Sequence, residues 1–254
     1  MKKIVITAGG TSEPIDTVRS ITNSSTGRLG CEICAALLKQ KSAEIEKIFY
    51  LCPLRAVRPP ESPLVEVVTT GGTASLLETV KSLLTENRID IFIHSMAVSD
   101  YTVDYVSSVS LLSLEISEKL KERGQAGDTR ALIEETIRNN GAVLTGNKIS
   151  SDEKNLIIKL KPTPKVISAI KPLSPGTFLV GFKLLSGVPE EELRRVGMNL
   201  LQKNRCDLVV ANDLANISGE RHKALLLRPD GSFLRAETKA EIANLIISEA
   251  FGRD

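Results

Sequence analysis

The sequence predicts an α/β fold: a doubly wound, mostly parallel, Rossmann-like sheet with an antiparallel edge and a helical insertion. Three observations lead to this fold class. Short apolar runs alternate with amphipathic helical patterns along most of the chain. These runs are apolar throughout, as expected of parallel strands that are covered on both faces. Near the end of the chain, Pro229-Asp230-Gly231 separates two short apolar segments, which indicates an antiparallel hairpin.

The expected elements begin at the first residues. Leu29, Ile33 and Leu37 are spaced four apart, which indicates the first helix. In the first part of the chain we expect strands at 4–6, 45–51, 64–68 and 90–95, and helices at 26–41 and 73–86. In the last part we expect strands at 156–160, 178–182, 208–210, 224–227 and 232–235, and helices at 164–170, 189–203 and 239–251. Pro189 is expected in the first turn of its helix.

Residues 102–147 interrupt the alternation. They are predicted to form an insertion on the sheet with helices at 112–123 and 129–139. The chain has 254 residues, of which 42% are hydrophobic and 25% charged, enough for a full core without metal or disulfide. We therefore expect a single domain over 1–254, with the insertion and a flap at about 102–151.

Composition and charge exclude several functions. The 33 Lys and Arg against 31 Asp and Glu leave a net charge of +2, too little for a general polyanion binder. Trp is absent and aromatic residues make up 4%, so no nucleic-acid partner is expected. Lys2-Lys3 precedes an apolar stretch shorter than a signal-peptide core, and no run approaches the ~18 apolar residues of a membrane span. A cytoplasmic protein without membrane contact is expected.

Cys31 and Cys34 form the single C-x-x-C of the sequence. This spacing occurs in redox pairs and in half-sites for zinc. Here it lies within the first helical pattern, without a second C-x-x-C and with only two histidines in the chain. We interpret both cysteines as core residues, and the residues that would bind any metal stay unknown.

In an open parallel sheet, ligands bind at the carboxyl ends of the strands. The loop after the first strand, Ala8 to Thr11, contains Gly9-Gly10 and lets backbone amides approach a ligand. It lacks the G-x-G-x-x-G dinucleotide fingerprint, and a purely structural turn is the alternative. The weaker Gly71-Gly72 is interpreted as a structural turn.

The segment before the first helix, Arg19 to Arg28, combines hydroxyls, the amide of Asn23 and two cations. A helix start offers unpaired N–H groups and the positive end of the dipole, which suits a phosphate or carboxylate oxygen. Ordinary capping by Ser25 or Thr26 is the alternative.

Two later loops complete the candidate site. Asp100, in the loop that starts at Ser95, could bind a ribose, a base edge or a metal, or could be a simple cap. Lys148 lies in a Gly/Asn/Ser loop suited to folding over a phosphate, unless it is a solvated surface lysine. His94 and His222 have no recognisable partner, which disfavours histidine-driven catalysis. Amide, hydroxyl and cation chemistry, which stabilises phosphoryl and acyl oxyanions, is what remains.

These residues resemble the phosphopantothenate–cysteine ligases of coenzyme A biosynthesis over nearly the whole chain. The matching segments are Ile6-Thr7-Ala8-Gly9-Gly10-Thr11-Ser12-Glu13-Pro14-Ile15-Asp16, Val18-Arg19, Ile21-Thr22-Asn23-Ser24-Ser25-Thr26-Gly27, Ala97-Val98-Ser99-Asp100-Tyr101, Lys148-Ile149-Ser150-Ser151, Leu160-Lys161-Pro162-Thr163-Pro164-Lys165, Val180-Gly181-Phe182 and Asp207-Leu208-Val209-Val210-Ala211-Asn212-Asp213.

The resemblance implies a ligase that joins 4′-phosphopantothenate and L-cysteine through an acyl nucleotidylate. CTP or ATP would be the cosubstrate, with Mg²⁺ on the triphosphate, and the sequence does not decide between the two nucleotides. The resemblance implies the following roles: Asn23, Lys148 and Arg19 catalytic; Gly9, Gly10, Thr11, Ser24, Ser25, Thr26, Gly27 and Ala97 substrate-binding; Ser95, Met96, Ala97, Asp100, Lys148, Thr163, Pro164, Lys165, Phe182 and Lys203 nucleotide-binding.

The chain departs from the family pattern in three places. Many bacterial relatives have K-x-K-K at the flap, where this chain retains only Lys148 and has Ser150-Ser151. Lys203 matches a family lysine only if one residue is inserted near Asn199. No decarboxylase domain precedes the first strand, so the resemblance implies a stand-alone ligase with a separate decarboxylase in the pathway, and the 102–147 insertion resembles that of homodimeric members.

Two other function classes stay open at this point. An NAD(P)-dependent oxidoreductase could use the same fold, although the missing glycine fingerprint argues against it. A non-catalytic nucleotide-binding module would bind a triphosphate without releasing pyrophosphate.

Overall fold

The computed structural model describes residues 1–123, 128–139, 144, 149–150 and 154–252. The chain forms two compact units. The first contains residues 1–11, 23–98 and 164–254, and the second contains residues 12–22 and 99–163. The chain therefore passes from one unit to the other four times.

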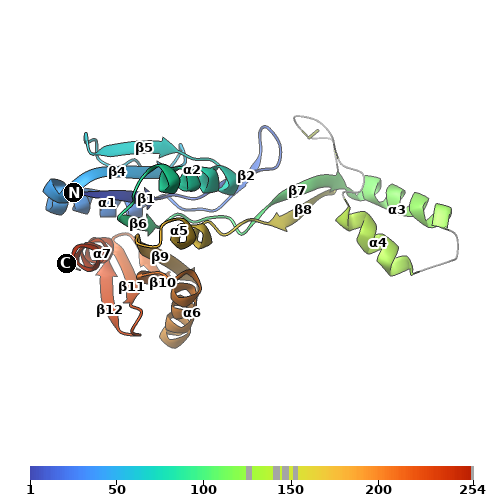
Figure 1. The fold of residues 1–254 in the computed structure, drawn as a ribbon. Helices are drawn as coiled ribbons and strands as arrows, with labels where there is room; N and C mark the ends of the chain where they lie inside the picture. The colour runs from blue at the N-terminus through green and yellow to red at the C-terminus, as the bar shows by residue number, and fades with distance from the viewer. Residues whose placement is uncertain (124–127, 140–143, 145–148, 151–153, 253–254) are drawn as a thin grey trace. The chain divides into compact units, whose positions relative to one another are not determined.

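The first unit contains an eight-stranded sheet in the order β12-β11-β10-β9-β6-β1-β4-β5 (Figure 1). The six strands from β10 to β5 are parallel, and β11 and β12 form an antiparallel edge. This arrangement confirms the predicted fold class. The strands are β1 (Lys2–Thr7), β4 (Ile45–Cys52), β5 (Val65–Thr69), β6 (Ile91–His94), β9 (Phe178–Leu185), β10 (Leu208–Ser218), β11 (Arg221–Leu227) and β12 (Phe233–Thr238).

Helices cover both faces of this sheet (Figure 1). Alternate residues of a strand point to opposite faces, and β1 follows this rule. Ile4 and Ile6 belong to the core cluster that includes α1 and α7, whereas Val5 belongs to the cluster with α2, α5 and α6. The helices are α1 (Arg28–Lys41), α2 (Thr73–Glu86), α5 (Ile167–Leu173), α6 (Glu190–Asn204) and α7 (Lys239–Phe251), with a short 3-10 turn, η1 (Ser42–Glu44).

In the part that the structure describes, the second unit contains two antiparallel strand pairs and two helices. A hairpin joins β2 (Ser12–Pro14) to β3 (Ser20–Thr22), and β7 (Tyr101–Ser108) pairs with β8 (Leu156–Pro162). The helices are α3 (Val109–Arg123) and α4 (Thr129–Arg138). The expectation that 156–160 belongs to the main sheet is wrong, because β8 pairs with β7, a strand that the helical interpretation of 102–147 missed.

Helix starts agree with the sequence expectation or differ from it by up to three residues. Pro189 is the N-cap of α6 and precedes its first turn. Gly27, with φ 79°, is the N-cap of α1, and a glycine has no side chain with which to cap the helix. The amide of Arg28, the first residue of α1, donates to the Oγ1 of Thr26 at 3.4 Å, so Thr26 makes a long capping contact of the kind the alternative considered above expected.

Of the two cysteines in the C-x-x-C, Cys34 is a core residue, as predicted, whereas Cys31 is only half-buried. All four cysteines are free thiols, and Cys52 and Cys206 are buried as well. Burial raises the pKa of the Cys34 thiol to about 12, so the thiolate needed for redox or metal chemistry is disfavoured. Within the described ranges, no group of three or more His, Cys, Asp or Glu residues could hold a metal ion.

None of the helices in the described part of the chain is long and apolar enough to cross a membrane.

Candidate functional site

The candidate site lies at the carboxyl ends of β1 and β6. From β1 the chain continues to β4 and β5 on one side, and from β6 to β9 and β10 on the other, so the strand order reverses here. A crevice at such a switch point is where doubly wound sheets bind ligands. The loops after both strands are joined, because the Ala97 amide donates to the Gly9 carbonyl at 2.8 Å and the Thr11 amide donates to the Ala97 carbonyl at 3.1 Å.

The glycines of the first loop allow a close approach of two backbone segments. A Cβ atom on Gly10 would lie 1.9 Å from the carbonyl oxygen of Asn23. Gly9 has φ 88°, and a Cβ on Gly27 would lie 3.0 Å from the Gly9 amide nitrogen. The loop after β1 and the segment before α1 therefore contact each other directly, which neither would do with a side chain at these positions.

Asn23 is held by its backbone and by a longer side-chain contact. Its amide donates to the Thr11 carbonyl at 3.1 Å, and its Nδ2 lies 3.5 Å from the Ala97 carbonyl oxygen. The side chain is half-buried, whereas the following Ser24 and Ser25 are exposed. The structure thus brings Asn23, the glycine loop and Ala97 together.

The start of α1 lies beside this constellation. A Cβ on Gly30 would lie 2.6 Å from the Cβ of Ala8 and 3.0 Å from the Oγ of Ser95, so the first turn of the helix is packed against both loops. The Arg28 amide donates to the Thr26 Oγ1 at 3.4 Å, and the amide groups of the first turn together with the helix dipole give this end of α1 a positive potential. Such an end favours phosphate or carboxylate oxygen.

A hydrogen-bond network under the loop after β6 was not predicted. Thr7 and His94 face each other in the register of β1 and β6, and the Thr7 Oγ1 lies 2.9 Å from the His94 Nδ1. Ser95 Oγ donates to the Thr7 carbonyl at 2.7 Å, and the Met96 amide donates to the Thr7 Oγ1 at 3.3 Å. Burial lowers the pKa of His94 to about 4, so the ring is neutral at physiological pH.

Both histidines, which the sequence left without partners, have one in the structure. His94 pairs with Thr7, and the Nε2 of His222 lies 3.0 Å from the Nδ2 of Asn212. Thr7 and His94 are each the last residue of a buried strand, so the sequence contained a hint of the first pair. Recognising the pair also required the register between the two strands.

In the second unit, Arg19 is anchored to Ile149. The guanidinium Nη2 of Arg19 donates to the Ile149 carbonyl at 2.7 Å. Asp16 accepts from the amides of Val18 at 2.8 Å, Arg19 at 2.7 Å and Ile149 at 3.2 Å. These hydrogen bonds, the one from Val18 first, hold the pKa of the Asp16 carboxyl below its usual range. Lys148 precedes Ile149 in the chain and lies outside the residues that the structure describes.

The residues predicted to bind the nucleotide are distributed over both units. In the second unit, Thr163 is buried, donates from Oγ1 to the Ser99 carbonyl at 2.5 Å and donates from its amide to the Asp100 carbonyl at 3.0 Å. In the first unit, Ser168 of α5 donates to the Oδ1 of Asn204 at 2.9 Å, so the end of α6 with Lys203 lies beside the start of α5. Pro164 and Lys165 directly precede α5, and Phe182 is half-buried on β9.

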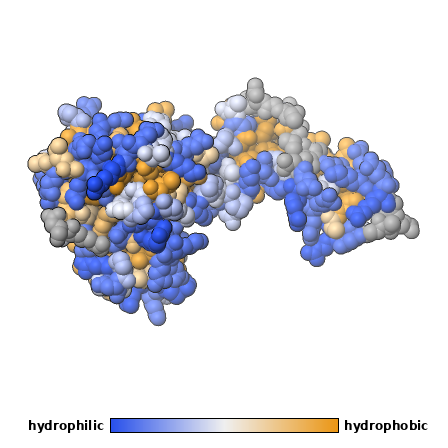
Figure 2. Space-filling model, in the orientation of Figure 1, coloured by the Kyte–Doolittle hydropathy of each residue, from blue (hydrophilic) through white to orange (hydrophobic). Residues whose placement is uncertain are grey.

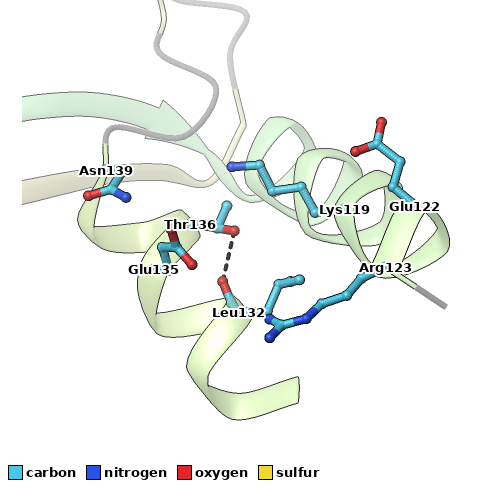
Figure 3. A pocket seen from close by; sticks show the side chains of 7 residues that line it. All are labelled: Lys119, Glu122, Arg123, Leu132, Glu135, Thr136 and Asn139. Atoms are coloured by element: carbon cyan, nitrogen blue, oxygen red, sulfur yellow. Dashed lines mark hydrogen bonds between the residues drawn. The ribbon is translucent and has the colours of Figure 1, made fainter. Parts of the chain in front are cut away.

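A cavity of about 330 Å³ lies elsewhere, between α3 and α4 (Figure 3). Its lining is mainly polar and charged, and includes Lys119, Glu135 and Thr136, whose Oγ1 donates to the Leu132 carbonyl at 2.9 Å. None of the predicted site residues lines it. We assign it no function.

Comparison with known families shows which family the chain belongs to. Residues 1–113 and 141–252 match the family described as "DNA/pantothenate metabolism flavoprotein C-terminal domain". The chain belongs to this family. A crystal structure of the DNA/pantothenate metabolism flavoprotein from Streptococcus pneumoniae is 33% identical, with a TM-score of 0.79 and 100% coverage of both chains. This agreement confirms the resemblance found in the sequence and the α/β fold.

The curated relatives extend the comparison. The "Coenzyme A biosynthesis bifunctional protein CoaBC" of Thermococcus kodakarensis is 30% identical over 249 residues, which are 98% of this chain and 50% of that protein. The chain thus spans about half the length of the curated relatives it matches. A structure of a Cab2 mutant in complex with phosphopantothenate-cysteine is 19% identical, with a TM-score of 0.65 over 99% of this chain and 86% of the other, and it shares the fold.

Proposed function

We propose that this chain is a phosphopantothenate–cysteine ligase that works through an acyl nucleotidylate. In the first step a carboxylate oxygen of 4′-phosphopantothenate attacks the α-phosphorus of a nucleoside triphosphate, and pyrophosphate leaves. In the second step the cysteine amine attacks the acyl carbon, the bond from that carbon to the phosphate oxygen breaks, and the nucleoside monophosphate leaves as the nitrogen loses a proton. The observation that carries the proposal is the convergence of Asn23, the glycine loop and Ala97 at the switch point of the sheet.

The side-chain amide of Asn23 can donate hydrogen bonds to the reacting oxygens. Both steps pass through states with negative charge on oxygen, which fixed N–H donors stabilise. The Nδ2 of Asn23 has two hydrogens, and its contact to the Ala97 carbonyl, at 3.5 Å, is at the long limit of a hydrogen bond. In the proposal this amide stabilises the reacting acyl and phosphoryl oxygens.

The start of α1 and the polar residues before it would bind the substrate phosphate or carboxylate. The exposure of Ser24, Ser25 and Thr26 and their place directly before the helix support this role. Arg19 remains assigned to catalysis, and its bond to the Ile149 carbonyl supports a role in fixing the segment that follows Lys148. Lys148 stays a predicted catalytic and phosphate-binding residue.

Magnesium fits this site as an ion that arrives with the nucleotide. The described residues include no cluster of three carboxylate, histidine or thiol ligands, so a cage built by the protein alone is not what they offer. Mg²⁺ characteristically keeps several waters and binds through substrate phosphates with one or two carboxylates. In the proposal Asp100, exposed after β6, is one carboxylate that would bind the ion, and the ion would neutralise the triphosphate.

A pyrophosphate-release assay tests the function. We expect release only when phosphopantothenate is present, with CTP and ATP tested separately, and product formation only when cysteine is added. Release that does not depend on phosphopantothenate would contradict the ligase assignment. Triphosphate binding without any release would favour a nucleotide-binding module.

We also propose that two copies of the chain associate through the second unit. Val109 is 46% exposed, Leu114 58%, Ile158 37% and Leu160 41%, and Figure 2 shows hydrophobic residues on the visible face of the β7–β8 ribbon. Contiguous exposed apolar patches mark contact surfaces, and in the proposal these residues of α3 and β8 contribute to one. Sedimentation at micromolar concentration should give a dimer, and Leu114→Glu should weaken it. A monomer at that concentration would refute the proposal.

A further inference from the structure

Thr7 and His94 form a buried polar pair inside an otherwise apolar part of the sheet. Thr7 is 0% and His94 8% exposed, and their neighbours on the same strands, Ile6 and Ile93, are apolar core residues. The ring of His94 also meets Phe92 edge-on, with centroids 6.0 Å apart. A valine at position 7 would fill the same volume without a polar atom, so packing alone does not account for the hydroxyl.

Two polar contacts meet at the Thr7 hydroxyl. The Met96 amide can only donate, so it uses a lone pair of the Thr7 Oγ1. The oxygen keeps a second lone pair and its hydrogen, so the direction of its contact with His94 Nδ1, 2.9 Å away, is set by the tautomer of the ring. Burial keeps the ring neutral, with a pKa of about 4, so one of its two nitrogens is an acceptor.

We propose that Thr7 and His94 are a positioning pair that fixes the turn Ser95-Met96-Ala97 and, through it, the side-chain amide of Asn23. The connection is continuous: Thr7 holds the Met96 amide, and the next residue, Ala97, presents the carbonyl that faces the Asn23 Nδ2. In the proposal the Thr7 hydroxyl donates to the Nδ1 of His94, which orients the hydroxyl so that a lone pair faces the Met96 amide. The effect on turnover rests on the proposed ligase function, whereas the effect on the turn does not.

Other hydrogen bonds also hold the turn, and they show which part of it depends on Thr7 and His94. Ser95 donates from its amide and from Oγ to the Thr7 carbonyl, and Ala97 donates to the Gly9 carbonyl. These bonds hold the two ends of the turn. The amide of Met96, in the middle, is held by the Thr7 side chain, and its orientation decides the direction of the following Ala97 peptide.

The experiment compares Thr7→Val, which keeps the shape and removes the hydroxyl, with Thr7→Ser, which keeps the hydroxyl. Amide hydrogen exchange measured by NMR should be about 10-fold faster at Met96 in T7V than in T7S, the scale expected for one lost hydrogen bond, and unchanged at Ile4. The Asn23 side-chain amide resonances should shift in T7V only. Turnover should fall about 10-fold in T7V with a smaller change in KM. Equal exchange at Met96 in the two variants would overturn the proposal.

A second pair of variants covers the case in which T7V does not fold. Asn in place of His94 offers an acceptor near the position of Nδ1, whereas Gln offers one near that of Nε2. We expect H94N to retain Met96 protection and H94Q to lose it; equal protection in both would overturn the proposal. If the unmodified protein releases no pyrophosphate, the ligase assignment fails, but the exchange at Met96 still decides the positioning role.

Discussion

The Cα of Gly10 is so close to the backbone of Asn23 that a Cβ added to the glycine would lie 1.9 Å from the Asn23 carbonyl oxygen. No relaxation of a side chain can relieve this contact, because both partners are backbone. The next residue after Gly10 also holds Asn23, because the Asn23 amide donates a hydrogen bond to the Thr11 carbonyl. The position of the proposed oxyanion donor is therefore set by a glycine thirteen positions earlier in the chain.

Gly10→Ala should displace the segment that contains Asn23. We expect destabilisation of about 1–3 kcal/mol from overpacking and a loss of turnover of about 10²-fold from misplacement of the reacting groups. Thermal unfolding and pyrophosphate release measure the two effects. Gly71→Ala is the matched control, since its Cβ would meet nothing within 4 Å. Normal turnover in G10A would show that this close approach does not position Asn23.

Asn23→Asp tests the amide itself. The change keeps the shape, removes the N–H donor and adds a negative charge, so turnover should fall by at least ~10²-fold. Circular dichroism and thermal unfolding should be close to those of the unmodified protein. Asn244→Asp is the control, because Asn244 uses only its Oδ1, to accept from Gln40, and aspartate keeps that acceptor. If N23D turns over like N244D, Asn23 has no part in the reaction.

Asp16→Ala should release Ile149 from the second unit's hairpin. The carboxylate accepts from three backbone amides, and its loss leaves the bond from Arg19 to the Ile149 carbonyl as the remaining anchor described for that residue. Hydrogen exchange by mass spectrometry should be faster in the peptide that contains Ile149. Asp230→Ala, which removes a similar turn carboxylate that accepts from Ser232, should leave that peptide unaffected. Unchanged exchange in D16A would mean that the contact is dispensable.

The neutral state of His94 predicts a pH dependence of stability. Its folded-state pKa, about 4, lies below the ordinary value of 6.5, so the unfolded chain takes up a proton more readily. The contribution of His94 is fully present above about pH 6.5 and is lost as the pH falls toward 4, with about 2 kcal/mol lost between pH 7 and pH 5. Urea unfolding of H94N should show a weaker decline over this interval. Burial also lowers the pKa of His222 to about 4, but His222 is present in both proteins, so its contribution cancels in the comparison. Parallel declines would refute the prediction.

The periodicity of the sequence predicts most of the sheet and its helices. In strands such as Ile45–Cys52, residues 48–52 are a continuous apolar run buried on both faces, and this pattern needs no knowledge of the partner strand. Helices such as Thr73–Glu86 bury one stripe, which a single-chain pattern also contains.

The second unit was harder to predict, because its elements are short or two-sided. The strand Tyr101–Ser108 combines exposed and buried positions without a clean alternation, and its partner Leu156–Pro162 lies about fifty residues later. The hairpin of Ser12–Pro14 and Ser20–Thr22 has three residues a side, below the length at which period-two patterns are distinctive.

The residues of the candidate site also differ in how far the sequence predicts them. Asn23 and the glycine loop were identified because unusual residues stand at strand and helix ends, where the fold puts ligands. Thr7, His94 and Asp16 act through partners that are distant in sequence or through backbone groups, and residue identities do not report such contacts. The strand register, once it is known, does report one of these contacts, because Thr7 and His94 are paired residues of adjacent strands.

The second unit is assembled from two separate stretches, 12–22 and 99–163, with 76 residues of the first unit between them. It therefore cannot be gained, lost or grafted as one cassette. An excision of the later stretch would leave the hairpin, with Asp16 and Arg19, behind, and a chimaera that exchanges this unit between relatives must exchange both stretches together.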